Sequence, residues 1–174
     1  NLFLFLIAYL LYNDVIETII VMAAVFATME LKMAQSELMG CFLMIQYVAF
    51  FGALGFGMCA DRWSNKASLL VSLTIWSMVI IWTMFMRDSV EFWISAAVIA
   101  LVLGGSQSVS RSLFGKMVPR GQESQFYGFL GLSGKISSFT GPLVFGIVHE
   151  LSGQIRLAIF SLLVILLIGQ GLLF

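Results

Sequence analysis

The sequence predicts an all-α membrane protein with six transmembrane helices, and three observations lead to this fold class. Hydrophobic residues make up 60% of the 174 residues and charged residues only 10%, with a mean hydropathy of +1.03. Six segments are apolar over the roughly 20 residues that a helix needs to cross a bilayer. The breaks between these segments hold most of the charged residues. A water-soluble protein of this length could not bury so much apolar surface.

The apolar segments and the breaks between them set the expected order of the helices. All the breaks are short, so consecutive helices are expected to be antiparallel neighbours. No segment alternates between apolar and polar residues over about ten positions, which argues against a β-barrel. We therefore treat residues 1–174 as a single transmembrane bundle. Its helices are expected at residues 3–28, 37–60, 68–86, 90–111, 123–148 and 155–174.

The breaks between the helices differ in their positive charge. The second and fourth breaks together hold five Lys and Arg residues, whereas the first, third and fifth hold three. Positive residues in short loops favour the cytoplasmic side of a membrane. We therefore expect loops 61–67 and 112–122 in the cytoplasm, together with both ends of the chain. The expected location is a bacterial inner membrane or an organelle membrane, with the protein as a multi-pass integral protein of the lipid bilayer.

The six expected helices are not equivalent. The third and the sixth contain no ionisable residue over positions 69–86 and 157–174, and we expect both to face lipid. The other four carry polar groups at depth. A division of the chain between Arg87 and Glu91 gives two sets of three helices, each ending in an apolar helix. This pattern favours two inverted three-helix repeats, an architecture that many transporters share.

Three polar residues lie near the middle of the first helix, namely Asn13, Asp14 and Glu17. Tyr9, Asn13 and Glu17 are spaced four residues apart, so they share one face of the helix. An acidic side chain at mid-bilayer costs about 2.5–3.5 kcal/mol, and two of them require a cavity, a partner or protonation. We interpret the three residues as a substrate or proton site. The alternative is a structural cluster of hydrogen bonds between helices.

Lys135 lies about halfway along the fifth helix, at a similar membrane depth. A buried lysine can bind an anion or carboxylate, pair with Asp14 or Glu17, or relay a proton. It belongs to a stripe of small and polar residues that suits either a cavity wall or close helix packing. We assign Lys135 and Ser138 to the site, and the glycines to packing. The stripe consists of Ser124, Gly128, Gly131, Lys135, Ser138 and Pro142, and its proline favours a bend.

A third polar position lies on the fourth helix, where Gly104, Gln107 and Arg111 fall along one face. Gln107 can orient a polar solute, and an interhelical hydrogen bond is the equal alternative. Arg111 lies near the expected cytoplasmic end, where a long side chain is expected to extend toward the membrane surface. The sequence therefore predicts a central cavity lined by the first, second, fourth and fifth helices, with solute-site residues on the first, fourth and fifth.

The break after the second helix resembles the loop signature of the major facilitator superfamily. That signature is a glycine, three residues, Asp, a basic residue, a variable residue, Gly and further basic residues, between helices two and three of each half. Ser64 and Asn65 stand where the family has a glycine and a basic residue, so the match is partial. We interpret the segment as a cytoplasmic gate loop, with a solvated topology loop as the alternative. The matching residues are Gly57, Asp61, Arg62 and Lys66.

Two longer segments, residues 103–114 and 127–142, resemble the vacuolar-effluxer-like family of autophagy-related amino-acid exporters within that superfamily. The resemblance covers most of the chain and implies the C-terminal six-helix half of a twelve-helix transporter. The chain begins at Asn1 inside an apolar run, so we expect a fragment whose partner is a missing N-terminal half. The resemblance further implies solute transport, with amino acids as the substrate class.

The function that the sequence favours is secondary active transport of a small polar solute by alternating access, with proton coupling as one mechanism. The alternative is a non-transporting scaffold or receptor with the same fold. Nine basic and nine acidic residues balance, which gives no indication of a nucleic-acid partner. We expect no catalytic site, because no nucleophile elbow or phosphate loop occurs. No metal or cofactor is expected, since the single histidine, His149, has no ligand cluster around it.

Overall fold

The computed structural model describes residues 2–62, 64–119 and 121–173, and these form helices without a strand. Within the helices, the side chains of residues 61, 123, 129, 133, 134 and 136–138 lie outside the described part. The helices are α1 (Leu2–Met29), α2 (Gln35–Arg62), α3 (Asn65–Thr83), α4 (Ser89–Met117), α5 (Glu123–Ser152) and α6 (Ile155–Gly171). The expected all-α class is therefore confirmed.

Two helix boundaries differ from the expected ones. Helix α4 continues past residue 111 to Met117, and α2 and α3 are separated by residues 63 and 64 alone. Much of the expected loops 61–67 and 112–122 is therefore helical. Hydropathy marks where a helix leaves the apolar layer, whereas the helix itself ends where the backbone must change. Val118 has extended dihedral angles because Pro119 disfavours the helical conformation in the residue before it.

Four of the described helices are long and apolar enough to cross a bilayer, namely α1, α2 up to Ala60, α3 and α4. Helix α6 is apolar but has 17 residues. Helix α5 is long, but it contains Lys135 and Pro142 and ends with His149 in its last turn. Spans in α5 and α6 therefore remain predictions. Helix α5 ends at Gly153, whose φ of 66° closes the last turn in the left-handed region.

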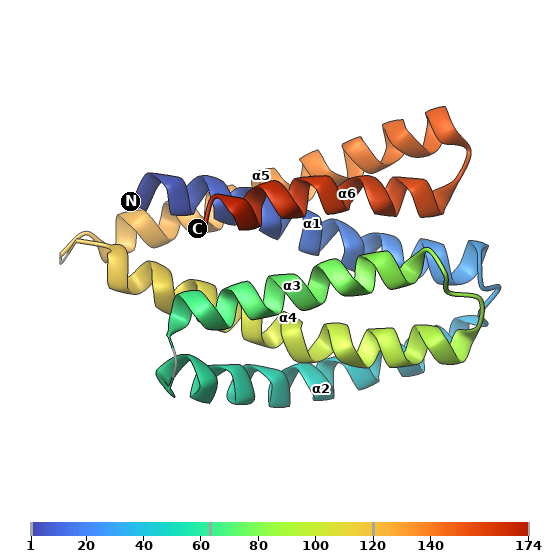
Figure 1. The fold of residues 1–174 in the computed structure, drawn as a ribbon, viewed down its shortest axis with the longest axis horizontal. Helices are drawn as coiled ribbons and strands as arrows, with labels where there is room; N and C mark the ends of the chain where they lie inside the picture. The colour runs from blue at the N-terminus through green and yellow to red at the C-terminus, as the bar shows by residue number, and fades with distance from the viewer. Residues whose placement is uncertain (1, 63, 120, 174) are drawn as a thin grey trace.

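The helices lie side by side and alternate in direction (Figure 1). The α2–α3 and α4–α5 connections lie at the same end of the bundle as both termini, and the other three connections lie at the opposite end. Helix α2 packs mainly against α4, α3 lies against α4 and α6, and α1 lies against α5 and α6. The antiparallel order expected from the short breaks thus groups the second and fourth connections at one end, and the side of the membrane that they face stays a prediction.

Glycines allow α2 and α4 to approach closely at one point. A Cβ atom added to Gly52 would meet the backbone of Leu101, and one added to Gly104 would meet the backbone oxygen of Ala49. Small residues at such points permit the backbones of membrane helices to come together. The two helices therefore form the most extensive contact in the described part of the bundle.

Helices α3 and α6 present apolar side chains on their outer surfaces. Met78 and Trp82 of α3 and Val164 and Ile168 of α6 are more than half exposed. Exposed apolar side chains at helical spacing are suited to contact with lipid chains. Helix α2 exposes apolar side chains such as Phe51 and Met58 to a similar extent, so the lipid-facing role of α3 and α6 in particular stays a prediction.

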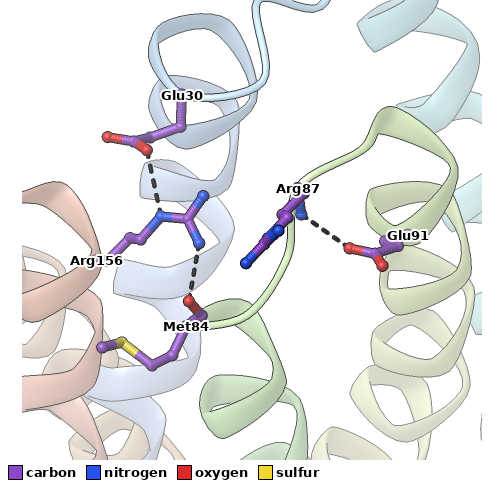
Figure 2. A network of polar contacts seen from close by, with 5 residues as sticks. All are labelled: Glu30, Met84, Arg87, Glu91 and Arg156. Carbon is purple, nitrogen blue, oxygen red and sulfur yellow. Dashed lines mark hydrogen bonds and ion pairs between the residues drawn. The ribbon is translucent and has the colours of Figure 1, made fainter.

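One arginine joins three helices at the end of the bundle opposite the termini (Figure 2). Arg156 of α6 donates from Nε to Glu30 Oε2 at 3.2 Å and from a terminal nitrogen to the Met84 carbonyl oxygen at 2.8 Å. Its guanidinium carbon also lies 5.6 Å from the Phe26 ring centroid. Because Glu30 follows α1 and Met84 follows α3, Arg156 holds the ends of α1, α3 and α6 together.

Replacing Arg156 with alanine is expected to lower the stability of the full-length protein in detergent. The variant loses a charge-assisted hydrogen bond and leaves the Glu30 carboxylate without its partner. Because both side chains are partly exposed, the expected loss is about 1 kcal/mol, or a melting temperature lower by about 2–4 °C. Thermal melting measures it. Arg87→Ala is the matched control, since Arg87 bonds Glu91 Oε2 through its backbone nitrogen. Equal melting of the two variants would contradict the proposed tether.

Candidate functional site

The polar side chains of α1 point in different directions. The Tyr12 hydroxyl lies 2.7 Å from Ser110 Oγ and links α1 to α4. Asp14 points to α5, where its Oδ1 accepts the backbone N–H of Gly141 at 2.8 Å. Asn13 and Glu17 make no hydrogen bond or ion pair through their side chains to any described residue. Of the three residues predicted from the sequence, Asp14 therefore forms a contact between helices, whereas the side chains of Asn13 and Glu17 have no described partner.

Asp14 lies at the closest approach of α1 to α5. Its side chain is buried, and its backbone carbonyl accepts the Thr18 hydroxyl at 2.7 Å. A Cβ atom added to Gly141 would meet Thr18 Oγ1 and Asp14 Oδ1. The next residue, Pro142, has no N–H and interrupts the hydrogen-bond ladder of α5. Asp14 therefore binds α5 at its proline, as the structural interpretation of this residue expects.

Asn13 and Glu17 lie one helical turn apart on α1. Asn13 is 7% exposed, and Glu17 is half-buried. Amide and carboxylate groups that are buried without partners are costly, and such groups inside a span usually serve a ligand, an ion or a water-filled cavity. These two groups therefore remain available to a solute in the described part of the structure.

Gln107 of α4 and Lys135 of α5 are both exposed in the six-helix bundle. Neither Asp14 nor Glu17 forms an ion pair with a described residue, so the pairing of Lys135 with either carboxylate is not formed here. Lys135 lies six positions before Gly141, on the part of α5 that precedes the proline. The Ser138 side chain lies outside the described part, so its place in the site stays a prediction.

An apolar cavity of about 90 Å³ lies between α1, α2, α3 and α4. Ile20 lies on its wall one turn from Glu17, and Leu103 lies on its wall one turn from Gln107. Glu17 and Gln107 are therefore each one helical turn from a residue that lines the apolar cavity. A site with a few polar groups beside apolar walls is the usual form of a small-molecule pocket.

Sequence reasoning missed the surroundings of Arg111. The Tyr127 hydroxyl donates to the Arg111 carbonyl oxygen at 3.3 Å, and a Cβ atom added to Gly115 would lie 2.7 Å from that hydroxyl. One residue before Arg111, Ser110 Oγ lies 2.7 Å from the Tyr12 hydroxyl of α1. Arg111 therefore lies where α1, α4 and α5 converge. The sequence did place Arg111 on one face with Gly104 and Gln107, which could have indicated a role in the site. Its position near a helix end instead favoured an arginine at the membrane surface.

The gate loop is shorter than expected. Gly57 lies inside α2, Arg62 is its last residue, and Lys66 is exposed at the start of α3. The Asp61 side chain lies outside the described part. The proposed gate contact of this loop therefore stays a prediction.

The two residues that depart from the superfamily signature have structural roles. Ser64 Oγ accepts the Ala67 N–H at 3.1 Å and caps α3. Asn65 is buried, accepts from Lys116 Nζ at 2.9 Å, and donates to Ser112 Oγ at 2.7 Å. Asn65 therefore joins the start of α3 to the end of α4. Residues 112–117 stay helical in part because this contact holds them.

The sequence model of the family described as vacuole effluxer Atg22 like matches residues 1–174. The uncharacterized MFS-type transporter YxiO of Bacillus subtilis is 36% identical over 168 residues, which cover 97% of this chain and 39% of that protein. Autophagy-related protein 22 of Kluyveromyces lactis is 30% identical over 177 residues, covering 95% of this chain and 36% of that protein. The same protein of Vanderwaltozyma polyspora is 29% identical over 177 residues, covering 95% and 34%. The chain thus spans about a third to two fifths of these relatives.

Proposed function

The chain belongs to the vacuole effluxer Atg22-like family, and we propose that it forms one half of a secondary transporter. The proposed cargo is a small polar solute, with amino acids as the first class to test, and transport occurs by alternating access. One observation carries the proposal. Asn13 and Glu17 are polar groups inside a membrane-spanning helix, and no described residue satisfies them. A protein that used them only for stability would pair them.

Each polar residue has a distinct proposed role. Glu17 is the charged residue of the solute or proton site, and Asn13 and Gln107 orient the solute. Lys135 and Ser138 of α5 contribute from the opposite side. Asp14 supports the site indirectly, because its bond to Gly141 holds α5 against α1 six residues from Lys135. The apolar cavity beside Ile20 and Leu103 gives room for an apolar part of the solute.

The proposed architecture combines this bundle with a second six-helix half. Its own six helices form two inverted three-helix repeats, with the connections near residues 61–67 and 112–122 on the cytoplasmic side. Asp61, Arg62, Lys66 and Gly57 form the gate at that surface. The span of the matched relatives, about two and a half to three times the length of this chain, supports a larger protein.

The rival function is a scaffold or receptor in which the buried charges only hold helices together. The contact of Asp14 with Gly141 favours that interpretation for this one residue. The pattern does not extend to Glu17, which has no described partner to hold. A transporter therefore requires the Glu17 carboxylate for solute flux, whereas a scaffold or receptor does not. Transport measurements on a Glu17 variant distinguish the two functions.

The test uses the full-length protein in proteoliposomes. Uptake and efflux of a radiolabelled mixture of L-amino acids are followed with and without an imposed proton gradient. We expect flux above that of protein-free vesicles, and stimulation by the gradient if the proton is coupled. Flux equal to that of empty vesicles in both directions would contradict amino-acid transport.

A further inference from the structure

Arg111 differs from the other cations near its end of the bundle. Lys116 donates to Asn65 Oδ1 at 2.9 Å, and Arg62 lies at the last residue of α2. Arg111 lies six residues before the end of α4, about 9 Å along the axis. Its guanidinium forms no hydrogen bond or ion pair with a described residue. Arg111 is therefore a permanent positive charge within helix α4, and its guanidinium has no hydrogen-bond partner among the described residues.

The Arg111 side chain is exposed in the six-helix bundle, whereas the α4 backbone around it contacts other helices. Gly115, one turn beyond, lies under the Tyr127 hydroxyl of α5. Phe114 lies between rings of two helices, 5.3 Å from the Tyr127 centroid and 6.1 Å from that of Phe5. The exposed Arg111 side chain therefore lies beside a point where α1, α4 and α5 contact one another, and its guanidinium is accessible to a bound group.

The groups around this point match one chemical class. A guanidinium presents parallel N–H donors that fit the two oxygens of a carboxylate. The Tyr9 hydroxyl makes no hydrogen bond with a described residue and is a further donor. Glu17 lies two turns along the same face of α1, about 12 Å away. The positive charge of Arg111 on α4 and the negative charge of Glu17 on α1 are therefore separated along the bundle, which favours one orientation of a zwitterion.

We propose that Arg111 and Tyr9 form the subsite that binds the carboxylate of the transported solute. Tyr127 positions the subsite, because its hydroxyl fixes the α4 backbone at Arg111. The proposal rests on the proposed transport function and assigns a group that the sequence interpretation placed at the membrane surface. It also gives the solute an orientation, with its cationic group toward Glu17.

The experiment measures amino-acid flux by the full-length protein in proteoliposomes. The probe is a radiolabelled mixture of L-amino acids, and the competitors are the same amino acids unlabelled and their carboxamides. Arg111→Gln is expected to raise KM by about tenfold or more and to remove the preference for carboxylate over carboxamide competitors. Arg111→Lys keeps the charge and is expected to show a smaller rise. Tyr9→Phe is expected to raise KM by a few fold.

The controls separate binding from folding and from the wider function. Arg87→Gln removes an exposed cation from the opposite end of the bundle and is expected to leave KM unchanged. Size-exclusion profiles and melting temperatures identify variants that misfold, and Arg111→Lys then provides the second measurement. An unchanged KM and an unchanged preference in Arg111→Gln would overturn the subsite, whether or not the maximal rate falls. Absence of flux in the unaltered protein would instead overturn the proposed function, and the subsite with it.

Discussion

Replacing Glu17 with glutamine is expected to abolish solute flux while leaving the protein folded. The carboxylate has no described partner, so the isosteric amide breaks no helix contact. It does remove a charge that would otherwise bind a cationic group or carry a proton. We expect flux to fall by at least about a hundredfold, since a charge-assisted interaction of about 3 kcal/mol is lost. Proteoliposome flux and thermal melting on the same preparation measure both quantities.

Two further variants define this result. Lys135→Met removes the opposing charge on α5 and is also expected to abolish flux. Glu150→Gln removes an exposed carboxylate near the end of α5 and serves as the control that keeps flux. Full transport by both Glu17→Gln and Lys135→Met would contradict the assignment of the site. A lower melting temperature with unchanged ligand binding would instead favour the scaffold alternative.

The contrast between Asp14 and Glu17 shows where sequence reasoning stops. Both are acidic, both lie near the middle of α1, and both carry the same insertion cost. Three residues correspond to 300° of rotation, so the two side chains lie only about 60° apart around the helix axis, and this small difference decides which of them reaches a neighbouring helix. Which side meets α5 depends on the packing of α1, and Gly141 meets Asp14 there. The sequence identifies the costly positions, but only the arrangement of neighbouring helices shows which one is satisfied.

The order of the helices was predictable for a different reason. In a bilayer the backbone must satisfy its own hydrogen bonds, so a sufficiently long apolar run has one structural solution. Boundaries outside the apolar layer follow other interactions. The extension of α4 to Met117 depends on Pro119 and on the contact of Lys116 with Asn65. Asn65 was interpreted as a departure from a signature, whereas its role comes from a tertiary contact that no local pattern contains.

Arg111 illustrates the same limit for the candidate site. Distance from a helix end predicts an arginine that extends to the surface, and the sequence offers no direct sign of Tyr127 beside it. The two residues are 16 positions apart and meet because the connection after α4 brings the first turns of α5 beside the end of α4. Residues that contact each other in a bundle often lie on different helices. Their contact is therefore known only once the packing of the helices is known.

Replacing Gly141 with alanine is expected to disrupt both stability and transport. The added methyl group would lie against Thr18 Oγ1 and within 2.8 Å of Asp14 Oδ1. To relieve the clash, α5 must move away from α1, which lengthens the bond between the Asp14 carboxylate and the Gly141 N–H. Overpacking costs about 1–3 kcal/mol, and weakening a buried hydrogen bond to a charged group adds about 1.5–3 kcal/mol. Thermal melting of the full-length protein and its flux provide the measurements.

Gly146→Ala is the matched control for this variant. Gly146 lies in the same helix, and a Cβ atom built there has nothing within 4 Å. Both substitutions replace a helical glycine, but Gly141 precedes Pro142, so its replacement also carries a local cost that Gly146→Ala lacks. Thr18→Ala removes the nearest atom of α1 and is expected to restore part of the stability of Gly141→Ala, which isolates the contact with α1. Equal melting temperatures for the two glycine variants would show that α1 and α5 do not depend on this approach.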